Sequence, residues 1–432
     1  MRGIFYLIVF FYVKYEGDQA VYRKFLAVLL LLALPWTALA AHTRDEVRAA
    51  YRDASSWEEA SPYARRPNVA APYDEGALEP GAVQDALDYL NFIRWLAGLE
   101  QVHVSEIYGY QCQHAAVLLA AQDYVDHDAP QPEDMDRNFY DSAHLGTASG
   151  NIAKFNWMRN SVIREGVAYF VRDDGEQNLP VLGHRRWALN PLMAATGFGL
   201  ANAQSGMSYV VMFAHDLGNP DATWDAVPWP AEGAFPAELM HDHLAWSVVL
   251  NPRKYDLEGS ALAVTLEETT TGMTFAFNPA EAAGDGFCAV NLDGYGAGGC
   301  VIFRPDFTGL DFTDYQQNQR WRVTIDGLKL RNGGQTRLQY RVDMISLRAE
   351  DVVNVEISAL EARMRPGETL RLTADVIPAY ADDLSVTWRS TDEAVAAVDE
   401  NGLVTARSEG ACEIICADCA GHEDACAVSV MP

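Results

Sequence analysis

The feature that most constrains the fold is a change in hydrophobic spacing along the chain. In three stretches between residues 80 and 172, apolar side chains recur every three or four residues, the period of a helix that packs on one face. From residue 246 onward, apolar residues fall in short runs separated by glycine, asparagine and aspartate turn signals, which is typical of antiparallel strands. With 49% hydrophobic residues, the chain can fill several cores. The sequence therefore predicts an α+β domain followed by all-β domains.

Three helices and a hairpin are expected in the N-terminal half. The first helix is expected over residues 80–98, where a proline favours the first turn and a glycine ends the apolar pattern. A second helix begins at Ser105, and a third covers residues 161–172. The acidic segment 126–148 is predicted as a loop, and residues 195–214 are predicted as an antiparallel hairpin.

Domain boundaries follow changes in composition. The segment after residue 218 is rich in proline and tryptophan and is interpreted as a linker. Near the C-terminus, Asn401-Gly402 lies between two short apolar runs and strongly indicates a hairpin. We therefore expect, in chain order, a signal region (1–40), a polar lead (41–78), an α+β domain (79–218), a linker (219–245), a β-sandwich domain (246–350) and a terminal all-β domain (351–432).

The first 40 residues have the pattern of a cleaved secretory signal. A basic pair at residues 23 and 24 precedes the apolar run 25–34, and Ala38-Leu39-Ala40 is a small-residue cleavage motif. The run is too short to span a bilayer, so we expect no membrane span in the mature chain. An earlier apolar run, residues 4–13, reflects either a start codon assigned too early or an extended signal. The protein is expected to be secreted, free or associated with the cell surface.

The net charge limits the partners. At pH 7 the formal charge of the chain is −28. A strongly acidic surface repels nucleic acid phosphates and anionic membranes. We therefore expect no nucleic acid partner and a soluble, well dispersed protein.

Because the chain is expected to be exported, the first expectation for its seven cysteines is that they form disulfides. Cys288 and Cys300 flank a glycine-rich turn and are predicted to form a local bridge. Cys112 shares a helical face with apolar residues and is predicted as a buried free thiol. Four more cysteines allow three pairings, or a zinc knuckle in place of bridges; they are Cys412, Cys416, Cys419 and Cys426.

Five short motifs of the N-terminal half occur in a distinctive order. They are LNFIR at 90–94 with a following Gly-Leu, His127 after a helix, GNIA at 150–153, GHRRWALNP at 183–191 and GFG at 197–199. Together they resemble the CAP superfamily, the SCP-like secreted proteins related to cysteine-rich secretory proteins, antigen 5 and pathogenesis-related proteins. The resemblance covers about residues 80–216. It implies an α-β-α sandwich with a central cavity.

The resemblance also implies a set of cavity residues, two histidines and two acidic residues. His127 and His184 match the two histidines. Gly150 stands at one acidic position, so that carboxylate is missing, whereas Asp173 best matches the other. The predicted cavity residues are His127, His144, Asn151, Asp173 and His184.

His127 and His184 are the predicted metal ligands, with Zn²⁺ as the possible ion and His144 or Asp173 as a further ligand. For His184 the alternative is a histidine that only satisfies backbone groups. The two arginines that follow it are expected at the surface, or else opposite Asp173 or Asp174.

The terminal domain carries a second set of motifs. PGETL occurs at 366–370, VTW at 386–388, GLVTA at 402–406 and VSV at 428–430. Over residues 353–431 these resemble the bacterial Ig-like domain of group 2. The resemblance implies a spacer or adhesive module without chemistry of its own.

Two functions of different class follow. The favoured hypothesis is a secreted, non-enzymatic protein whose CAP domain, displayed on the β domains, binds an extracellular lipid, glycan or protein. The alternative is a metal-dependent extracellular hydrolase in which His127 and His184 hold zinc and a carboxylate acts as the base. The glycine at position 150 weakens this alternative, because water activation needs a positioned base; His144 and Asp128 are the candidates to replace the missing carboxylate. A third option is that the CAP domain is only a scaffold.

Overall fold

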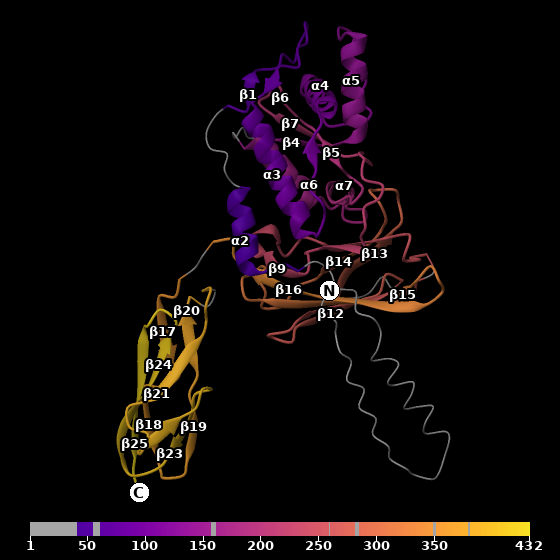
Figure 1. The fold of residues 1–432 in the computed structure, drawn as a ribbon. Coiled ribbons are helices and arrows are strands. Elements are labelled where there is room, and N and C mark those ends of the chain that lie inside the picture. The colour runs from indigo at the N-terminus through magenta and orange to yellow at the C-terminus, as the bar shows by residue number, and fades with distance from the viewer. Residues whose placement is uncertain are drawn as a thin grey trace, which may run out of the picture.

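The computed structural model describes residues 41–54, 61–156, 161–258, 260–280, 285–348, 351–378 and 381–432. The predicted secretory signal lies outside these residues. Among the described helices, none is both long and apolar enough to cross a membrane. Figure 1 shows helices packed over β-sheets, with a β unit at the C-terminus standing apart.

The N-terminal domain has an antiparallel sheet as its middle layer. The strand order is β4-β7-β6, so the hairpin strands lie next to each other and β4 pairs with the second of them. The strands are β4 (Gly150–Phe155), β6 (Phe198–Asn202) and β7 (Ser208–Phe213).

Helices cover both faces of this sheet. α4 (Glu106–Gln122) packs on β6 and β7 and also on α5 (Arg137–Ser149). On the other face, α6 (Val162–Arg172) contacts the sheet and packs against α3 (Pro80–Leu96). Short elements complete the domain: α2 (Arg44–Asp53), β1 (Tyr63–Arg65), β2 (Ala77–Leu78), β3 (His103–Val104), α7 (Gly183–Ala188) and β5 (Ala195–Thr196).

The side chains of β7 explain the layering. Tyr209 and Val211 pack in the core beneath α4, whereas Val210 and Met212 pack in the core that contains α3 and α6. Successive residues of a strand point to opposite faces, so a strand with both faces covered is apolar throughout. Helices therefore lie on both faces of the sheet, and the predicted α+β class is confirmed.

Two glycines set the distance between α4 and the sheet. A Cβ atom on Gly199 would lie 2.0 Å from the carbonyl oxygen of Cys112, and one on Gly197 would lie 2.2 Å from the backbone nitrogen of Gly109. Both contacts are shorter than any real Cβ contact, so only glycine permits this approach of helix and strand. The GFG motif is therefore a packing motif.

The predicted loop 126–148 is wrong, because α5 occupies its second half. The side chain of Asp136 caps this helix by accepting hydrogen bonds from the backbone N–H groups of Asn138 and Phe139, at 2.8 and 3.2 Å. The buried residues of α5 are Ala143, Gly146 and Thr147, which are too small or too polar to show an apolar period.

The middle domain is a β-sandwich, as expected. Its first sheet has the order β13-β14-β10-β8, and its second has the order β12-β11-β15-β16-β9. The strands are β8 (Ala226–Trp229), β9 (Gly233–Pro236), β10 (Trp246–Leu250), β11 (Ala263–Glu268), β12 (Thr274–Phe277), β13 (Gly286–Asn291), β14 (Gly299–Pro305), β15 (Arg320–Lys329) and β16 (Gln335–Ile345).

The predicted linker 219–245 is also wrong. β8 pairs with β10, and β9 pairs in parallel with β16, so this segment supplies one edge strand to each sheet. Proline is tolerated on edge strands, where no second neighbour needs its missing N–H. Trp229 and Phe235 are buried, at 1% and 0% exposure, and fix the segment in the core.

The N-terminal domain and the sandwich share one hydrophobic core. A single cluster of buried side chains runs from Val47 through the α3 and α6 region to Ile345 at the end of β16. We call the described residues up to 348 the head. Because the core is continuous, the two domains form one folded unit.

The C-terminal unit, residues 351–432, has a core of its own. The predicted hairpin at Asn401-Gly402 is confirmed: β22 pairs with β23, and Gly402 has a φ of 75°. The strands are β17 (Asn354–Ile357), β18 (Glu361–Met364), β19 (Thr369–Arg371), β20 (Ala374–Ile377), β21 (Val386–Ser390), β22 (Ala396–Val398), β23 (Leu403–Ala406), β24 (Gly410–Asp418) and β25 (Glu423–Val430).

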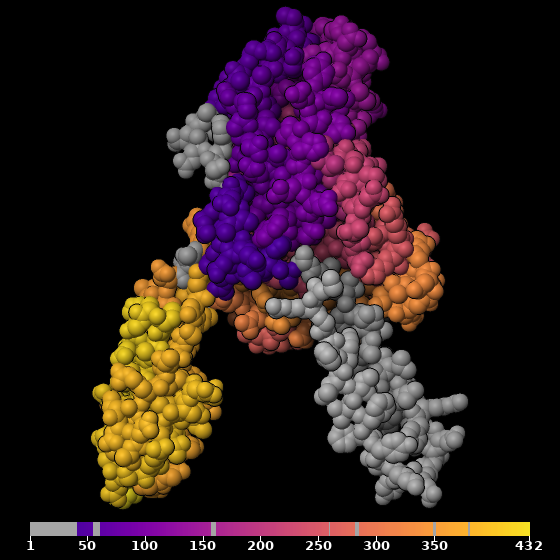
Figure 2. Space-filling model, viewed as in Figure 1, coloured from indigo at the N-terminus to yellow at the C-terminus, as the bar shows by residue number. Residues whose placement is uncertain are grey.

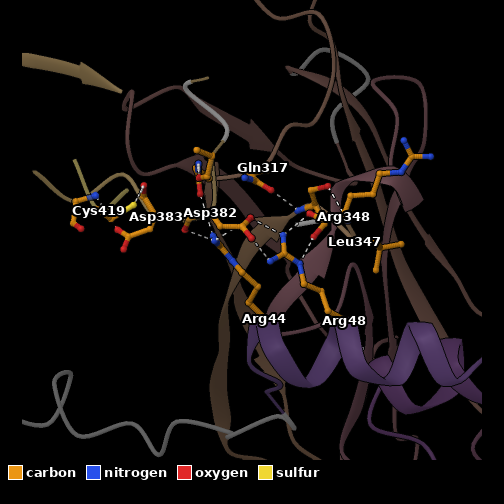
Figure 3. A network of polar contacts seen from close by, with 12 residues as sticks. Arg44, Arg48, Gln317, Leu347, Arg348, Asp382, Asp383 and Cys419 are labelled. Carbon is orange, nitrogen blue, oxygen red and sulfur yellow. Dashed lines mark hydrogen bonds and ion pairs between the residues drawn. The ribbon is translucent and has the colours of Figure 1, made fainter. Parts of the chain in front are cut away.

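Helix α2 joins the C-terminal unit to the head through two arginines, as Figure 3 shows. Arg48 makes a two-pronged ion pair with the carboxylate of Asp382 and also donates to the carbonyl oxygens of Ser346 and Arg348, at 2.9 and 2.6 Å. Arg44 donates to the carbonyl oxygen of Asp382 at 2.5 Å. We call Arg44, Arg48 and Asp382 the elbow. In the space-filling view of Figure 2, the C-terminal unit forms a separate lobe beside α2.

Candidate functional site

The histidine of the GHRR motif is held by a buried carboxylate. His184 Nδ1 lies 2.9 Å from Asp173 Oδ1, which also accepts a hydrogen bond from Asn178 Nδ2 at 2.8 Å. The backbone N–H of Arg185 donates to the second oxygen of Asp173 at 3.2 Å. The Asp173 side chain is fully buried and that of His184 is 21% exposed. The carboxylate therefore fixes the orientation of an imidazole that reaches solvent.

The backbone that positions this pair is strained. Asp173 ends α6 with a φ of 50°, and Leu182 precedes α7 with a φ of 46°. Both lie in the left-handed region, which aspartate tolerates but leucine rarely adopts. Strained residues persist only where the surroundings hold them, and they concentrate at functional sites. This placement makes the α7 site, defined as Asp173, His184 and Asn151, the leading candidate site.

Asn151 connects the central sheet to α7. Its side-chain amide donates to the carbonyl oxygen of His184 at 2.9 Å, and the residue is 2% exposed. Three of the predicted cavity residues, His184, Asp173 and Asn151, are thus joined by hydrogen bonds. Asn151 acts on the backbone of His184, so its role is positioning.

His127 lies near a histidine that the sequence analysis missed. His127 Nδ1 is 2.8 Å from the carbonyl oxygen of Thr147 at the end of α5. The ring of His215 packs on Trp187, with centroids 4.2 Å apart. Burial, and secondarily the neighbouring His127, lower the pKa of His215. The signal for His215 was its place directly after the predicted strand that ends at residue 214.

His144, the predicted helper for a metal, lies on α5 and faces a different partner. Its Nε2 atom is 2.9 Å from Asp128 Oδ1, and the aspartate side chain is 94% exposed. Across the described ranges, no three His, Cys, Asp or Glu side chains gather so that they could hold one ion. A zinc site usually needs three protein ligands and a water. The arrangement of the described histidines does not fit that requirement.

Two cavities of the head have no histidine in their lining. One of 380 Å³ is lined by Leu99, Trp224 and Glu232, between the end of α3 and β8. Another, of 210 Å³, lies beside α6 and is lined by Tyr89 and Arg164 among others.

The two arginines after His184 are buried, so the expected surface location is wrong. Arg185 and Arg186 are each 1% exposed. The guanidinium of Arg185 donates to the carbonyl oxygens of Val171 and Arg172 in α6 and of Ala245 before β10, at 2.6 to 2.7 Å. Burial lowers the pKa of Arg185 to about 10. This arginine joins the helical layer to the sandwich.

Arg186 makes a second connection between the helical layer and the sandwich, to the turn between β13 and β14. It donates to the carbonyl oxygens of Asp293 and Gly298, both at 2.8 Å, and its guanidinium lies over the ring of Tyr295 at 5.4 Å from the centroid. The same ring faces Gly183, where a Cβ atom would lie 2.9 Å from it. The GHRR motif thus presents one histidine while its neighbours connect two domains.

The predicted bridge between Cys288 and Cys300 is wrong. Both cysteines are free, and strand pairing shows why: Cys288 lies opposite Phe303, while Cys300 lies opposite Asn291. An offset of three residues separates the cysteines by about 10 Å along the strands and turns them to opposite faces. Burial raises the pKa of both thiols to about 11.

The other cysteines are free as well. Cys112 is fully buried, as predicted. Cys412, Cys416 and Cys426 lie in the core of the C-terminal unit, whereas Cys419 is exposed. No zinc knuckle is formed by the described cysteines.

Comparison with solved structures gives only low overall similarity. An intimin mutant from EHEC O157:H7 has a TM-score of 0.16 at 16% identity, covering 18% of this chain and 46% of that one. An intimin fragment in complex with the intimin-binding domain of its translocated receptor has a TM-score of 0.14 at 15% identity, covering 45% and 60%. Fibronectin(III)-like modules of Clostridium thermocellum CbhA give 0.15 at 13% identity, covering 43% and 84%. Such TM-scores carry no argument about function.

The chain thus spans about half the length of the first two structures it matches. Among curated proteins, no significant match was found. The CAP resemblance of residues 79–218 therefore remains a prediction. The family comparison does identify one part of the chain: residues 351–428 match the bacterial Ig-like domain of group 2.

Proposed function

We propose that the protein is exported and binds an extracellular ligand through the α7 site of its head, with the Ig-like C-terminal unit as a spacer. The observation that carries the proposal is the half-free imidazole of His184. Its Nδ1 is bonded to Asp173, and Nε2 has no hydrogen-bonding partner among the described residues. A fixed, partly exposed imidazole is suited to hydrogen-bond a polar group of a ligand.

The order of the layers supports assigning residues 79–218 as a CAP domain. The motifs that carry the CAP resemblance also lie together: the GHRR segment forms α7, the GNIA segment begins β4, and Asn151 connects the two. A hydrolytic role is less well supported, because a metal-activated water needs an ion and a positioned base. The described side chains provide no group of three ligands for such an ion.

Binding is tested with the purified mature chain and a matched pair of variants. In the control, His422→Ala, the deleted imidazole is also bonded to a buried carboxylate, with Nδ1 2.9 Å from Asp418, but lies in the C-terminal unit. The probes are phospholipid vesicles, a glycan array and a set of extracellular proteins. We expect the parent and His422→Ala to bind one of these classes of probe, and we expect His184→Ala to lose that binding.

The outcomes separate the hypotheses. Equal binding by all three proteins would exclude the α7 site as the ligand site. Zinc-dependent hydrolysis that disappears in His184→Ala would instead support the enzyme. A thermal unfolding curve of His184→Ala close to that of the parent is required in either case, since it excludes loss of the fold.

Export is tested independently. The small-residue motif at residues 38–40 predicts that the secreted protein begins at Ala41. N-terminal sequencing of the exported chain checks this. A mature N-terminus within residues 1–22 would contradict the predicted cleavage site.

A further inference from the structure

The 210 Å³ cavity beside α6 lies where the helical layer meets the sandwich, and we call it the interdomain pocket. Its lining comes from both parts: Tyr89 and Ile93 belong to α3, Arg172 to α6, Trp229 to β8, and Leu239 precedes β10. Figure 1 shows α3 and α6 side by side above the sandwich, and the two helices are in contact. Sites for small molecules are frequent where two domains meet. No residue of the α7 site lines this pocket.

Part of the lining is apolar and firmly held. Ile93, Val171 and Trp229 are 1%, 3% and 1% exposed and belong to the core of the head. Leu239 and Leu347 pack against that core. At about 30 Å³ for each water, the volume of the pocket corresponds to about seven waters. The pocket therefore suits the apolar body of a molecule the size of an amino acid.

Tyr89 brings an unpartnered hydroxyl to the pocket. The residue is 6% exposed and lines the pocket, and its hydroxyl has no hydrogen-bonding partner among the described residues. Burial raises the pKa of Tyr89 to about 12, and Arg164 and Arg172 oppose this shift, so both guanidinium groups lie near the hydroxyl. A buried tyrosine hydroxyl usually has a partner. A bound molecule can supply the partner that the protein lacks here.

Two charged side chains of the pocket also lack an ion pair. Arg172 and Glu165 form neither an ion pair nor a side-chain hydrogen bond with the residues that the structure describes. They are seven residues apart on α6, hence on one face of the helix and about 10 Å apart along its axis. Opposite charges that line one small pocket without pairing leave space for a molecule that pairs with both.

The other two charged groups of the pocket are engaged by the protein. Arg164 forms an ion pair with Asp85 at 3.0 Å, and its guanidinium lies over the ring of Tyr89, 4.6 Å from the centroid. Oε1 of Glu238 accepts a hydrogen bond from the hydroxyl of Ser346 at 2.9 Å. Arg172 and Glu165 are therefore the charges that a ligand can use.

We propose that the interdomain pocket binds a free α-amino acid with an apolar side chain. The carboxylate pairs with Arg172 and accepts a hydrogen bond from the Tyr89 hydroxyl, and the ammonium group pairs with Glu165. The apolar side chain packs on Trp229 and Ile93. A zwitterion has no net charge, so the formal charge of −28 does not repel it. The proposal does not depend on the proposed function, since it concerns residues outside the α7 site.

The test is a calorimetric titration of the mature chain with L-phenylalanine and with L-leucine. We expect one saturable equivalent in the parent. Two truncated probes separate the charges: 3-phenylpropionate lacks the ammonium group, and phenethylamine lacks the carboxylate. Each should bind at least about tenfold more weakly than L-phenylalanine, because one charged partner in the pocket is then left unpaired.

Variants assign each charge to its side chain. Arg172→Gln should weaken L-phenylalanine binding at least about tenfold and leave phenethylamine binding unchanged, whereas Glu165→Gln should weaken L-phenylalanine binding and leave 3-phenylpropionate binding unchanged. Tyr89→Phe removes only the hydroxyl. It should weaken L-phenylalanine binding without lowering the melting temperature, because that hydroxyl has no partner in the free protein. Arg253→Gln, exposed and outside the pocket, is the control and should bind like the parent.

Three outcomes would overturn the proposal. The first is that neither amino acid binds the folded parent. The second is equal affinity for L-phenylalanine and both truncated probes, since the pocket would then recognise only the apolar body. The third is unchanged L-phenylalanine binding in Arg172→Gln/Glu165→Gln, which would place the ligand elsewhere in the molecule; loss of that binding in His184→Ala would then assign it to the α7 site.

Discussion

At the residue scale, arginine acts in the head as a buried hydrogen-bond donor. Arg94, Arg185 and Arg186 are 0%, 1% and 1% exposed. Arg94 donates to the carbonyl oxygens of Ala188 and Asn190, both at 3.0 Å, so the GHRR segment is held from both sides. Sequence rules place arginine at the surface. The carbonyl groups that satisfy these side chains come from distant segments, which is why their burial could not be predicted.

Replacing Arg185 tests this role. Arg185→Met keeps an apolar stem of similar length but leaves the carbonyl oxygens of Val171, Arg172 and Ala245 without their donor. Several unsatisfied buried acceptors cost about 3 kcal/mol or more of unfolding free energy. Urea unfolding measures the loss. The control Arg253→Met, at an exposed position, should change stability by less than about 0.5 kcal/mol; equal effects of both would refute the role.

Two histidines with lowered pKa values, the buried His114 and the exposed His215, predict how stability depends on pH. Desolvation by the surrounding protein is the main cause that lowers the pKa of His114 and of His215 from the ordinary value of 6.5. As the pH falls below about 6.5, the unfolded chain binds protons before the folded chain does. The free energy of unfolding is therefore highest above this pH and decreases as the pH falls toward the lowered pKa values. We expect the melting temperature to fall between pH 7 and 5, and to fall less in His114→Gln/His215→Gln. An unchanged slope in this variant would contradict the assignment.

At the element scale, the elements with a clear apolar period were predicted. They are α3, α6, the β6–β7 hairpin and the β22–β23 hairpin; α4 was predicted as well, although every residue from Cys112 to Ala120 is buried. α5 was missed because its buried face consists of small and polar residues. β8 and β9 were missed because their prolines were interpreted as signals of a linker, although proline is tolerated on edge strands such as these. The predicted bridge between Cys288 and Cys300 is wrong because the register of β13 and β14 separates the two cysteines. Spacing along the sequence does not reveal this register.

Two glycine variants test the contact between α4 and β6. In Gly199→Ala, the new methyl group would lie 2.0 Å from the backbone oxygen of Cys112, so helix and sheet must separate and stability should fall by about 2 kcal/mol or more. Gly109→Ala, within α4, meets nothing within 4 Å and should add about 0.5–1 kcal/mol, since alanine favours helix. Chemical unfolding measures both. Similar effects in the two variants would contradict the close approach.

At the scale of the whole molecule, the candidate site was only partly predictable. His184, Asp173 and Asn151 are joined by hydrogen bonds, whereas His144 bonds elsewhere and His215 was missed. The order of the motifs indicated that His184, Asp173 and Asn151 lie on neighbouring elements. The continuity of the head depends on Arg185 and on the edge strands, neither of which shows in the linear pattern.

The elbow should fix the orientation of the C-terminal unit. The side chains of Arg48 and Asp382 are 8% and 27% exposed, and hydrogen bonding to Asp382 is the main cause that raises the pKa of Arg48. Arg48→Lys keeps the charge but cannot form the two-pronged pair, and Asp382→Asn removes the charge. Either change should release the unit, because its core is separate from that of the head.

Small-angle X-ray scattering measures that release as a larger maximum dimension and a broader distance distribution, while each unit keeps its own unfolding transition. Glu423→Gln is the control, since the Arg389–Glu423 pair is exposed and lies within the C-terminal unit. Scattering of Arg48→Lys and Asp382→Asn identical to that of the parent would show that the two units are oriented by other contacts. Release in both variants but not in the control would assign the orientation to the elbow, since the control removes an ion pair that lies within the C-terminal unit.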